Sequence, residues 1–257
     1  MNKFEKKIFF IGAGPGNAEL ITRAGWKALS NSEVIFYDAL IDFDSFFQAS
    51  PKAKWINVGK RASKISIEQD FIGRLLVNYS KKHYRIARLK GGDPSIFGRV
   101  SEEINEIRKH RIPFEIIPGV TAALSAAADL SVSLSKRNIA RSISFITTSV
   151  NPASTKKNNW IKTAINSDTV VFYMAGRERK KIAQELIKNG KNPSVPVAVV
   201  ENASSKDGKK KISTLQDLSN VDDPVLDGPV CLIIGNVLSD SQFCNEEIYK
   251  NLKQMSN

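Results

Sequence analysis

A glycine-rich turn near the N-terminus could bring the main chain against a ligand. Gly12-Ala13-Gly14-Pro15-Gly16 follows an apolar stretch and precedes a helix-like segment, and glycine lets a ligand approach the backbone closely. One interpretation is a dinucleotide-binding fingerprint, in which Asp38 binds a ribose. That fingerprint needs a further glycine where this chain has Asn17, and Pro15 lacks an N–H that could face a phosphate. A plain strand-to-helix turn is the other interpretation.

A second pair of glycines lies beside an acidic residue. Gly91-Gly92-Asp93-Pro94 offers access to the backbone next to a carboxylate, which can pair with the amino group of an amino-acid ligand or with a sulfonium charge. Asp93 followed by Pro94 is also a strong helix start, with Asp as N-cap and Pro in the first turn. The sequence therefore predicts a helix from here to about His110, with Asp93 either a ligand group or only a helix cap.

A third segment combines a turn with a hydroxyl group and small side chains: Pro118-Gly119-Val120-Thr121-Ala122-Ala123. Thr121 and nearby main-chain groups could hydrogen-bond a ligand, and the alanines leave room for it. The alternative is a tight turn into a buried, alanine-rich helix. This segment alone does not decide between the two.

The elements that must position these segments alternate between strand and helix, which indicates an α/β fold. Apolar runs predict strands at residues 7–12, 34–37, 54–58, 85–89, 114–117, 142–147, 169–174, 196–201, 211–213 and 229–235. Helical periodicity and capping signals predict helices at residues 18–30, 66 onward, 93–110, 120–130, 158–166, 178–189 and 241–253. We expect two α/β domains, residues 1–120 and 121–257, with Asp38 at the carboxyl end of the second strand.

The charge balance favours an anionic partner. The chain carries 38 Lys and Arg against 26 Asp and Glu, a formal net charge of +12. Nucleic acid and a small polycarboxylate are both candidates, and solvated surface lysines without any partner are the third interpretation. No basic motif with interleaved aromatic residues is present, and the densest run, Lys206 to Lys211, is typical of a hairpin turn. We therefore expect no nucleic-acid partner.

Cysteine and histidine usage argues against a metal site. The two cysteines cannot form a disulfide framework, and Cys231 lies in an apolar run where a buried hydrophobic role is expected. No Cys/His cluster has metal-ligand spacing. The chain has no run of about 18 apolar residues, and the apolar residues 8–11 are too few for a signal peptide. We expect a cytoplasmic protein that does not enter the membrane.

Several short motifs occur in a fixed order along the chain. They are Gly12-Ala13-Gly14-Pro15-Gly16, Tyr37-Asp38-Ala39-Leu40-Ile41, Val58-Gly59-Lys60-Arg61, Arg88-Leu89-Lys90-Gly91-Gly92-Asp93-Pro94 with Phe97-Gly98-Arg99, Pro118-Gly119-Val120-Thr121-Ala122-Ala123, Phe172-Tyr173-Met174 and Val197-Ala198-Val199-Val200-Glu201. Together they resemble the tetrapyrrole methylase family, and the resemblance covers about residues 7 to 240.

The resemblance implies two α/β domains with S-adenosylmethionine in the cleft between them, and a homodimer. The implied activity methylates two adjacent pyrrole rings of uroporphyrinogen III, giving precorrin-2 on the route to sirohaem and cobalamin. Asp38 matches the proposed proton acceptor and Lys60 the proposed proton donor. Since an ordinary Lys has a pKa of about 10.4, Lys60 is alternatively an anchor for a substrate carboxylate. The implied contacts to the methyl donor are Pro15, Gly91, Gly92, Asp93, Ile96, Thr121, Ala122, Met174 and Ala203.

The implied substrate is a polycarboxylate, which basic side chains near the cleft would bind. Besides Lys60, the candidates are Arg61, Arg99 and Arg137, each of which is otherwise an ordinary solvated charge. The chain also departs from the family pattern, which bears on substrate affinity and on the assignment of Ala203. The departures are Asn17, Val100, Ser101, Ser133, Lys136, Thr148, Ser149, Ala175 and Ala203.

Overall fold

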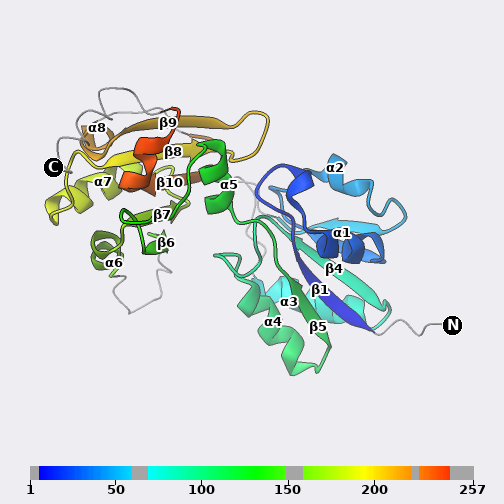
Figure 1. Cartoon of the computed structure of the whole chain (residues 1–257). Coiled ribbons are helices and arrows are strands. Elements are labelled where there is room, and N and C mark those ends of the chain that lie inside the picture. Colours follow the sequence, from blue (N-terminus) through cyan, green and yellow to red (C-terminus); the bar gives the residue numbers. More distant parts are fainter. Residues whose placement is uncertain (1–5, 60–68, 149–158, 221–225, 244–257) are drawn as a thin grey trace. The chain divides into compact units, whose positions relative to one another are not determined.

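A computed structural model describes residues 6–59, 69–148, 159–220 and 226–243. The chain divides into two compact units, Met1–Thr121 and Ala122–Asn257, each built on its own five-stranded sheet (Figure 1). The predicted α/β class with two domains is confirmed. Among the described helices, none has both the length and the apolar character needed to cross a bilayer.

The N-terminal unit is a parallel sheet with helices on both faces. Its strands follow the order β3-β2-β4-β1-β5, and every pairing is parallel. The strands are β1 (Lys7–Gly12), β2 (Val34–Tyr37), β3 (Lys54–Asn57), β4 (Arg85–Lys90) and β5 (Phe114–Ile117). The helices are the 3-10 helix η1 (Ala18–Leu20), α1 (Arg23–Ser30), α2 (Phe43–Phe47), α3 (Gln69–Ser80) and α4 (Val100–Lys109).

Alternation along β1 explains why helices cover both faces of this sheet. Ile8 and Phe10 pack in one apolar cluster with residues of α3 and α4, while Phe9 and Ile11 pack on the opposite side with residues of α1 and α2. Successive strand residues point to opposite faces, so a strand that is apolar throughout needs cover on both sides. Figure 1 shows α1 and α2 on one side of this sheet and α3 and α4 on the other. All carboxyl ends of the strands therefore meet at one edge, where ligands bind in open α/β sheets.

Two predicted helices of this unit are wrong in their bounds. The segment predicted as one helix over 18–30 consists of η1 and then α1, because Thr22 is extended and caps α1 by accepting the Gly25 N–H. The helix predicted to begin at Asp93 begins at Val100. Phe97 and Arg99 have left-handed backbone angles, φ 52° and 54°, so the chain cannot run helically from Pro94. The short helix α2 was not predicted.

The C-terminal unit is a mixed sheet in the order β6-β7-β10-β8-β9. β6 and β7 are parallel, β10 is antiparallel to both β7 and β8, and β9 is an antiparallel edge strand. The strands are β6 (Ile143–Thr147), β7 (Thr169–Tyr173), β8 (Pro196–Glu201), β9 (Lys209–Thr214) and β10 (Val230–Ile234). The helices are α5 (Ala122–Asp129), α6 (Trp160–Asn166), α7 (Arg179–Lys188), α8 (Leu215–Asn220) and the 3-10 helix η2 (Asn236–Asp240).

Most of this unit was predicted to within two residues. The basic turn predicted between Lys206 and Lys211 lies in the β8–β9 hairpin, although β9 already starts at Lys209. The core contains residues of β6, β7, β8 and β10 packed against α6, α7 and α8. The predicted helix over 241–253 lies largely outside the described residues, and α8 was not predicted.

The Cys231 thiol is predicted to be unreactive in the folded protein. Cys231 is buried in β10, and burial raises the pKa of its thiol to about 12. Because the thiolate is the nucleophile, iodoacetamide at about pH 8 should leave this thiol unmodified until denaturant is added. The experiment uses a Cys244→Ser background, so that mass spectrometry detects alkylation of Cys231 alone. Cys244 lies outside the described residues. Rapid alkylation of the native chain would contradict this burial.

The same pKa shift predicts a direction for stability with pH. The folded-state pKa lies above the ordinary value for a thiol, so the unfolded chain loses this proton first as pH rises. The contribution is complete below the unfolded pKa, about 8.5, and is lost progressively as pH rises toward 12. Cys231→Ala should therefore reduce the loss of stability on the alkaline side, as measured by urea unfolding across that range.

Candidate active site

Three loops from the carboxyl ends of β1, β4 and β5 meet through their glycines. The Gly14 N–H donates to the Gly92 carbonyl at 3.2 Å, and the Gly92 N–H donates back to the Gly14 carbonyl at 2.7 Å. A Cβ on Gly12 would lie 2.6 Å from the Cα of Gly119 and 2.8 Å from the carbonyl oxygen of Gly92. Main chain therefore packs directly on main chain, and these contacts leave no room for a side chain at Gly12.

The same loops leave open space beside the main chain at Gly91 and Gly92, and these two residues are called the cradle below. A Cβ at either position would meet no atom within 4 Å, and Gly92 has φ +68°, which favours glycine. Neither residue is kept small by neighbouring atoms of the protein. The main chain is therefore open at the pair of glycines that the sequence predicts to contact a ligand, and that contact stays a prediction.

The carboxylate of Asp93 links two of these loops through hydrogen bonds. Its Oδ1 accepts the Ser95 N–H at 2.7 Å, and its Oδ2 accepts the Gly119 N–H at 2.9 Å. The interpretation of Asp93 as the N-cap of a long helix is therefore wrong, because its carboxylate fixes the turn and the loop after β5. Thr121 is buried just beyond that loop. Pro15 and Ile96 are half-buried, and Ile96 donates its N–H to the Asp93 carbonyl at 3.2 Å.

Asp38 lies at the end of a chain of buried charges. It forms an ion pair at 2.5 Å with Nη2 of Arg88, whose side chain is 1% exposed. Arg88 also pairs with Glu103, which is fully buried, at 3.1 Å, and Lys90 pairs with the same carboxylate at 2.9 Å. Two acids and two bases thus neutralise one another inside the unit, where removing one partner of a pair typically costs about 3–5 kcal/mol.

The pKa shifts of the two bases follow from their surroundings. Burial alone would lower the pKa of Arg88, but the carboxylates of Asp38 and Glu103 raise it above its ordinary value. Burial lowers the pKa of Lys90, and the nearby charge of Arg88 lowers it further, while Glu103 opposes both. Arg88 is therefore a permanent cation beside Asp38.

Arg88, Glu103 and Lys90 were not predicted as parts of the site. The sequence contained a signal, because Arg88 and Lys90 lie two positions apart on the buried strand β4 and therefore point to the same face. Glu103 likewise falls on the buried face of α4, beside Val100, Ile104 and Ile107. Charges in buried positions are rare unless they are paired. A search for charged residues on apolar faces would have found all three.

The C-terminal unit brings Met174 and the segment around Ala203 to one edge of its sheet. β7 and β8 both run antiparallel to β10, so their carboxyl ends lie on the same edge. The start of β10 bridges them, since Val230 accepts the Ala175 N–H at 3.4 Å and Pro229 accepts the Asn202 N–H at 3.0 Å.

Met174 and Ala203 differ in exposure. Met174 is 58% exposed, has φ 56° and lines a pocket of about 670 Å³, whereas Ala203 is buried. The pocket is lined by Thr148, Met174, Gly176, Arg177, Glu178, Leu226, Asp227, Gly228, Pro229 and Val230.

The predicted residues thus divide between the two units. Pro15, Gly91, Gly92, Asp93, Ile96 and Thr121 belong to the N-terminal unit with Asp38, while Ala122, Met174 and Ala203 belong to the C-terminal unit.

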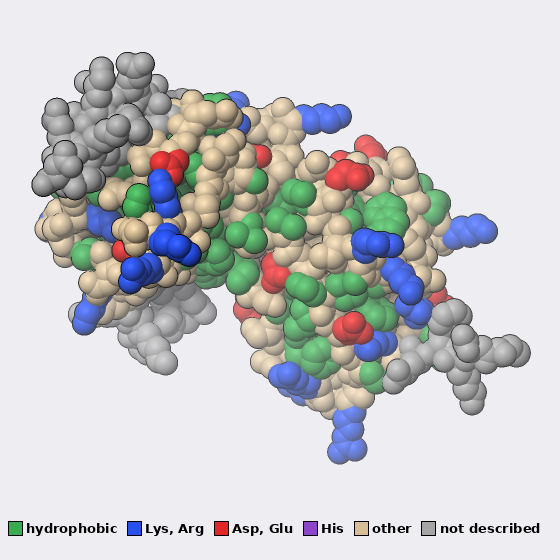
Figure 2. Space-filling view, viewed as in Figure 1, with side chains coloured by type: hydrophobic (Ala, Val, Ile, Leu, Met, Phe, Trp, Pro, Cys, Tyr) green, Lys and Arg blue, Asp and Glu red, His purple; other side chains and the backbone are tan. Residues whose placement is uncertain are grey.

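Of the predicted substrate-binding residues, Arg99 lies in the N-terminal unit and Arg137 in the C-terminal unit. Arg99 is half exposed and pairs with Glu102 at 2.5 Å, and Arg137 is exposed in the loop between α5 and β6. Lys60 and Arg61 lie outside the described residues. On the face drawn in Figure 2, Lys and Arg side chains occur on both units among acidic and hydrophobic ones.

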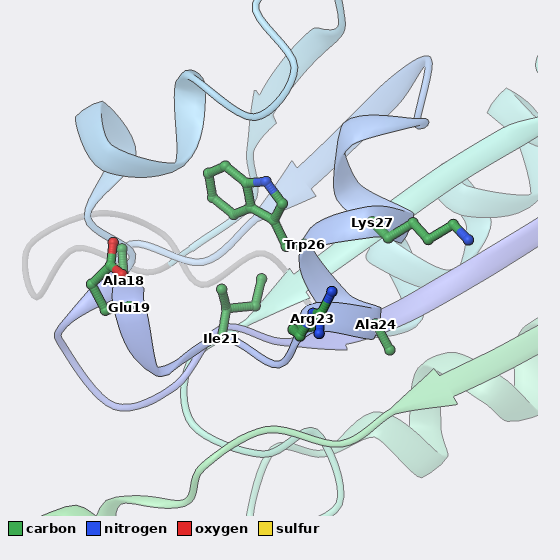
Figure 3. Close-up of a pocket in the computed structure, with 7 residues that line it drawn as sticks. All are labelled: Ala18, Glu19, Ile21, Arg23, Ala24, Trp26 and Lys27. Carbon is green, nitrogen blue, oxygen red and sulfur yellow. The ribbon is translucent and has the colours of Figure 1, made fainter.

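A second pocket, of about 650 Å³, lies on the N-terminal unit, and none of the predicted site residues lines it. It is lined by Ala18, Glu19, Ile21, Arg23, Ala24, Trp26 and Lys27. Figure 3 shows the Trp26 ring and Ile21 extending into the space between η1 and α1, while Lys27 points away. A dinucleotide site holds the pyrophosphate at the N-terminus of an α-helix that directly follows the glycine turn. Here the glycine turn leads into η1 instead, which disfavours the dinucleotide interpretation. In the described part of the chain, no group of His, Cys, Asp and Glu could hold a metal ion.

Comparison with known proteins agrees with these motifs. A family model described as Tetrapyrrole (Corrin/Porphyrin) Methylases matches residues 7–219. The chain is 37% identical over 242 residues to a uroporphyrinogen-III C-methyltransferase of Cyanidium caldarium, covering 93% of this chain and 96% of that protein. It is 36% identical over 235 residues to a siroheme synthase of Psychrobacter cryohalolentis, covering 91% of this chain and 45% of that protein. The chain therefore spans about half the length of the siroheme synthases it matches.

Solved structures give the same result. Uroporphyrin III C-methyl transferase from Thermus thermophilus has a TM-score of 0.77 at 28% identity, covering 90% of this chain and 93% of that chain. The same enzyme complexed with S-adenyl homocysteine has a TM-score of 0.76 at 28% identity, with the same coverage.

Proposed function

The chain belongs to the tetrapyrrole methylase family, and from this premise we propose that it is an S-adenosylmethionine-dependent C-methyltransferase. It methylates two adjacent pyrrole rings of uroporphyrinogen III, giving precorrin-2 for sirohaem and cobalamin biosynthesis. The observation that carries the proposal is the open main-chain cradle at Gly91 and Gly92, held by the glycine contacts of three loops. A relative with the same fold is known in complex with S-adenyl homocysteine.

The methyl donor supplies an electrophilic methyl group on a sulfonium sulfur. The chain's part is to hold the donor, align the substrate and exclude water, which is worth up to about 7–11 kcal/mol in well-oriented systems. The donor contacts are Pro15, Gly91, Gly92, Asp93, Ile96, Thr121, Ala122, Met174 and Ala203. These residues lie on both units, as expected for a cleft between two domains, although that cleft stays a prediction.

Asp38 is the proton acceptor in this proposal. A pyrrole carbon that gains a methyl group must lose a proton, and a carboxylate at the carboxyl edge of a parallel sheet is well placed to receive it. Arg88 orients the carboxylate through Oδ1, which leaves Oδ2 without a hydrogen bond to Arg88. Lys60 is a proton donor or an anchor for a substrate carboxylate.

The positive charge of the chain serves the binding of a polycarboxylate. Lys60, Arg61, Arg99 and Arg137 are the proposed anchors, with Arg able to bind a carboxylate through two hydrogen bonds. We propose a tetrapyrrole rather than nucleic acid as the anionic partner. The chain works as a homodimer in the cytoplasm, which light scattering and cell fractionation would test.

Salt is predicted to weaken substrate binding. Between about 0.1 M and 1 M salt the screening length falls from about 10 Å to about 3 Å, so exposed anchors such as Arg99 lose most of their attraction for carboxylates. The KM for the tetrapyrrole should rise steeply over that range, while the affinity for S-adenosylhomocysteine should change less. A KM that stays constant over the whole range would contradict the electrostatic anchoring.

The decisive test of the function is a direct assay. The purified chain is incubated anaerobically with uroporphyrinogen III and methyl-labelled S-adenosylmethionine, and the product is analysed by mass spectrometry. We expect two labelled methyl groups per tetrapyrrole. Calorimetry provides the comparison with other ligand classes, since binding of NAD without any response to S-adenosylhomocysteine would indicate a dehydrogenase instead. Salt-sensitive retention of RNA after nuclease treatment would indicate an RNA-binding protein.

A further inference from the structure

We infer that Glu103 is a positioning residue that sets the orientation of the Asp38 carboxylate through Arg88, an inference that rests on the proposed function. Glu103 comes from the first turn of α4 and is fully buried. It does not contact Asp38 itself. Its connection to Asp38 runs through a single guanidinium group.

All three nitrogens of the Arg88 guanidinium donate hydrogen bonds. Its Nε donates to both oxygens of Glu103, at 3.3 and 3.1 Å, and its Nη1 donates to the Leu89 carbonyl at 3.1 Å. Its Nη2 donates both to Glu103, at 3.2 Å, and to Asp38, at 2.5 Å. Because the group is planar and rigid, the bonds at Nε and Nη1 determine where Nη2 points. The orientation of Asp38 therefore depends on Glu103.

The sheet register explains why the two acids meet at one arginine. Phe36 of β2 pairs with Arg88 of β4, and Asp38 follows Phe36 by two positions, so it lies on the same side of the sheet. Ile86 of the same strand packs in the cluster that includes residues of α4, which places Arg88 on the face covered by that helix. Glu103 reaches the arginine from that helix, and Asp38 reaches it from the sheet edge.

Glu103 also connects Asp38 with the loop of the proposed donor site. Lys90 precedes Gly91 directly, and its Nζ donates to Oε1 of Glu103 at 2.9 Å. The Lys90 side chain lies beneath the same loop, since a Cβ on Gly98 would be 3.4 Å from its Cε. The side chain of the Glu103→Gln variant keeps an oxygen that can accept this hydrogen bond from Lys90, so the change should disturb Arg88 more than the cradle.

The test is a double-mutant cycle with Glu103→Gln and Asp38→Asn. Gln keeps the shape of Glu, but its NH2 group cannot accept the hydrogen bond that Nε of Arg88 donates to Oε2, so Arg88 loses part of the restraint that Glu103 provides. We expect kcat to fall by up to about 100-fold, since misplacing a reacting group by about 1 Å can cost that much, while the Kd for S-adenosylhomocysteine stays within about threefold. If Glu103 acts through Asp38, the double variant is no slower than Asp38→Asn alone. Effects that multiply would overturn the inference, because they would show that Glu103 acts independently of Asp38.

A second variant keeps the inference testable if Glu103→Gln does not fold. Arg88→Lys keeps the positive charge but cannot hold two carboxylates through one planar group, and it should give the same non-additive result with Asp38→Asn. If Glu103→Gln cannot be purified, this second cycle decides, and additivity there overturns the inference. Glu106→Gln is the matched control on the same helix, where Glu106 pairs with exposed Lys109, and we expect unchanged kcat.

Wild-type activity measured beside the variants separates this inference from the proposed function. An active wild type with an additive cycle overturns only the role of Glu103. A wild type that makes no methylated product overturns both.

Discussion

Replacing Asp38 with Asn should lower turnover by about 10²–10⁴ while the protein still binds S-adenosylhomocysteine. Positioned acid–base groups typically contribute this much, and Asn has nearly the same shape as Asp but cannot accept the proton. Asp38 is only partly buried at the carboxyl end of β2, where Arg88 holds one of its oxygens. Single-turnover kinetics with uroporphyrinogen III, together with calorimetry for the donor product, measures the two effects separately.

The matched control is Asp44→Asn. Asp44 lies exposed in the first turn of α2 in the same unit, so it tests the loss of one negative charge without touching the site, and kcat should stay unchanged. If Asp38→Asn retained near-normal kcat, Asp38 would be a hydrogen-bonding group at a strand end and not the base. If both variants lost activity, the effect would come from net charge.

Adding one methyl group to the cradle should weaken donor binding without weakening the fold. A Cβ on Gly91 meets no protein atom within 4 Å, so Gly91→Ala should leave the melting temperature almost unchanged. The methyl group would occupy space proposed for the donor, and overpacking costs about 1–3 kcal/mol, which corresponds to a loss in affinity of about 5–150-fold. Calorimetry with S-adenosylhomocysteine measures this loss.

Gly12→Ala provides the opposite case. Its Cβ would lie 2.6 Å from Gly119 and 2.8 Å from the Gly92 carbonyl, so the three loops would have to separate. We expect both a lower melting temperature and weaker binding. Full donor affinity in Gly91→Ala would show that the cradle does not hold the donor.

The sequence predicted the strands well because their signals are local. The apolar runs at 7–12 and 34–37 appear as β1 and β2 with the same bounds. The helix predicted from Asp93 failed because a distant partner overrides the local capping signal: the carboxylate bonds to the N–H of Gly119, 26 residues away. A single sequence contains the cap motif but not the loop that competes for it.

The candidate site could be predicted where its residues lie in contiguous motifs, and not where it depends on the register between strands. Gly91 and Gly92 could be singled out from their spacing, and the structure leaves space beside both. The pairing of Arg88 with Asp38 arises because β4 lies beside β2 although β3 separates them in sequence. Periodicity places Glu103 on a buried face and so indicates that it is paired, but it does not reveal which residues are its partners.

Three of the chain's basic side chains lie on the edge strand β9 of the C-terminal sheet. Its first residues, Lys209, Lys210 and Lys211, are exposed on the last strand of the C-terminal sheet. An uncovered strand edge offers unpaired N–H and C=O groups to any other extended chain, and lysines along such an edge oppose aggregation through repulsion and desolvation. By this principle, the lysines of β9 would oppose the addition of a strand from another copy of the chain beside β9.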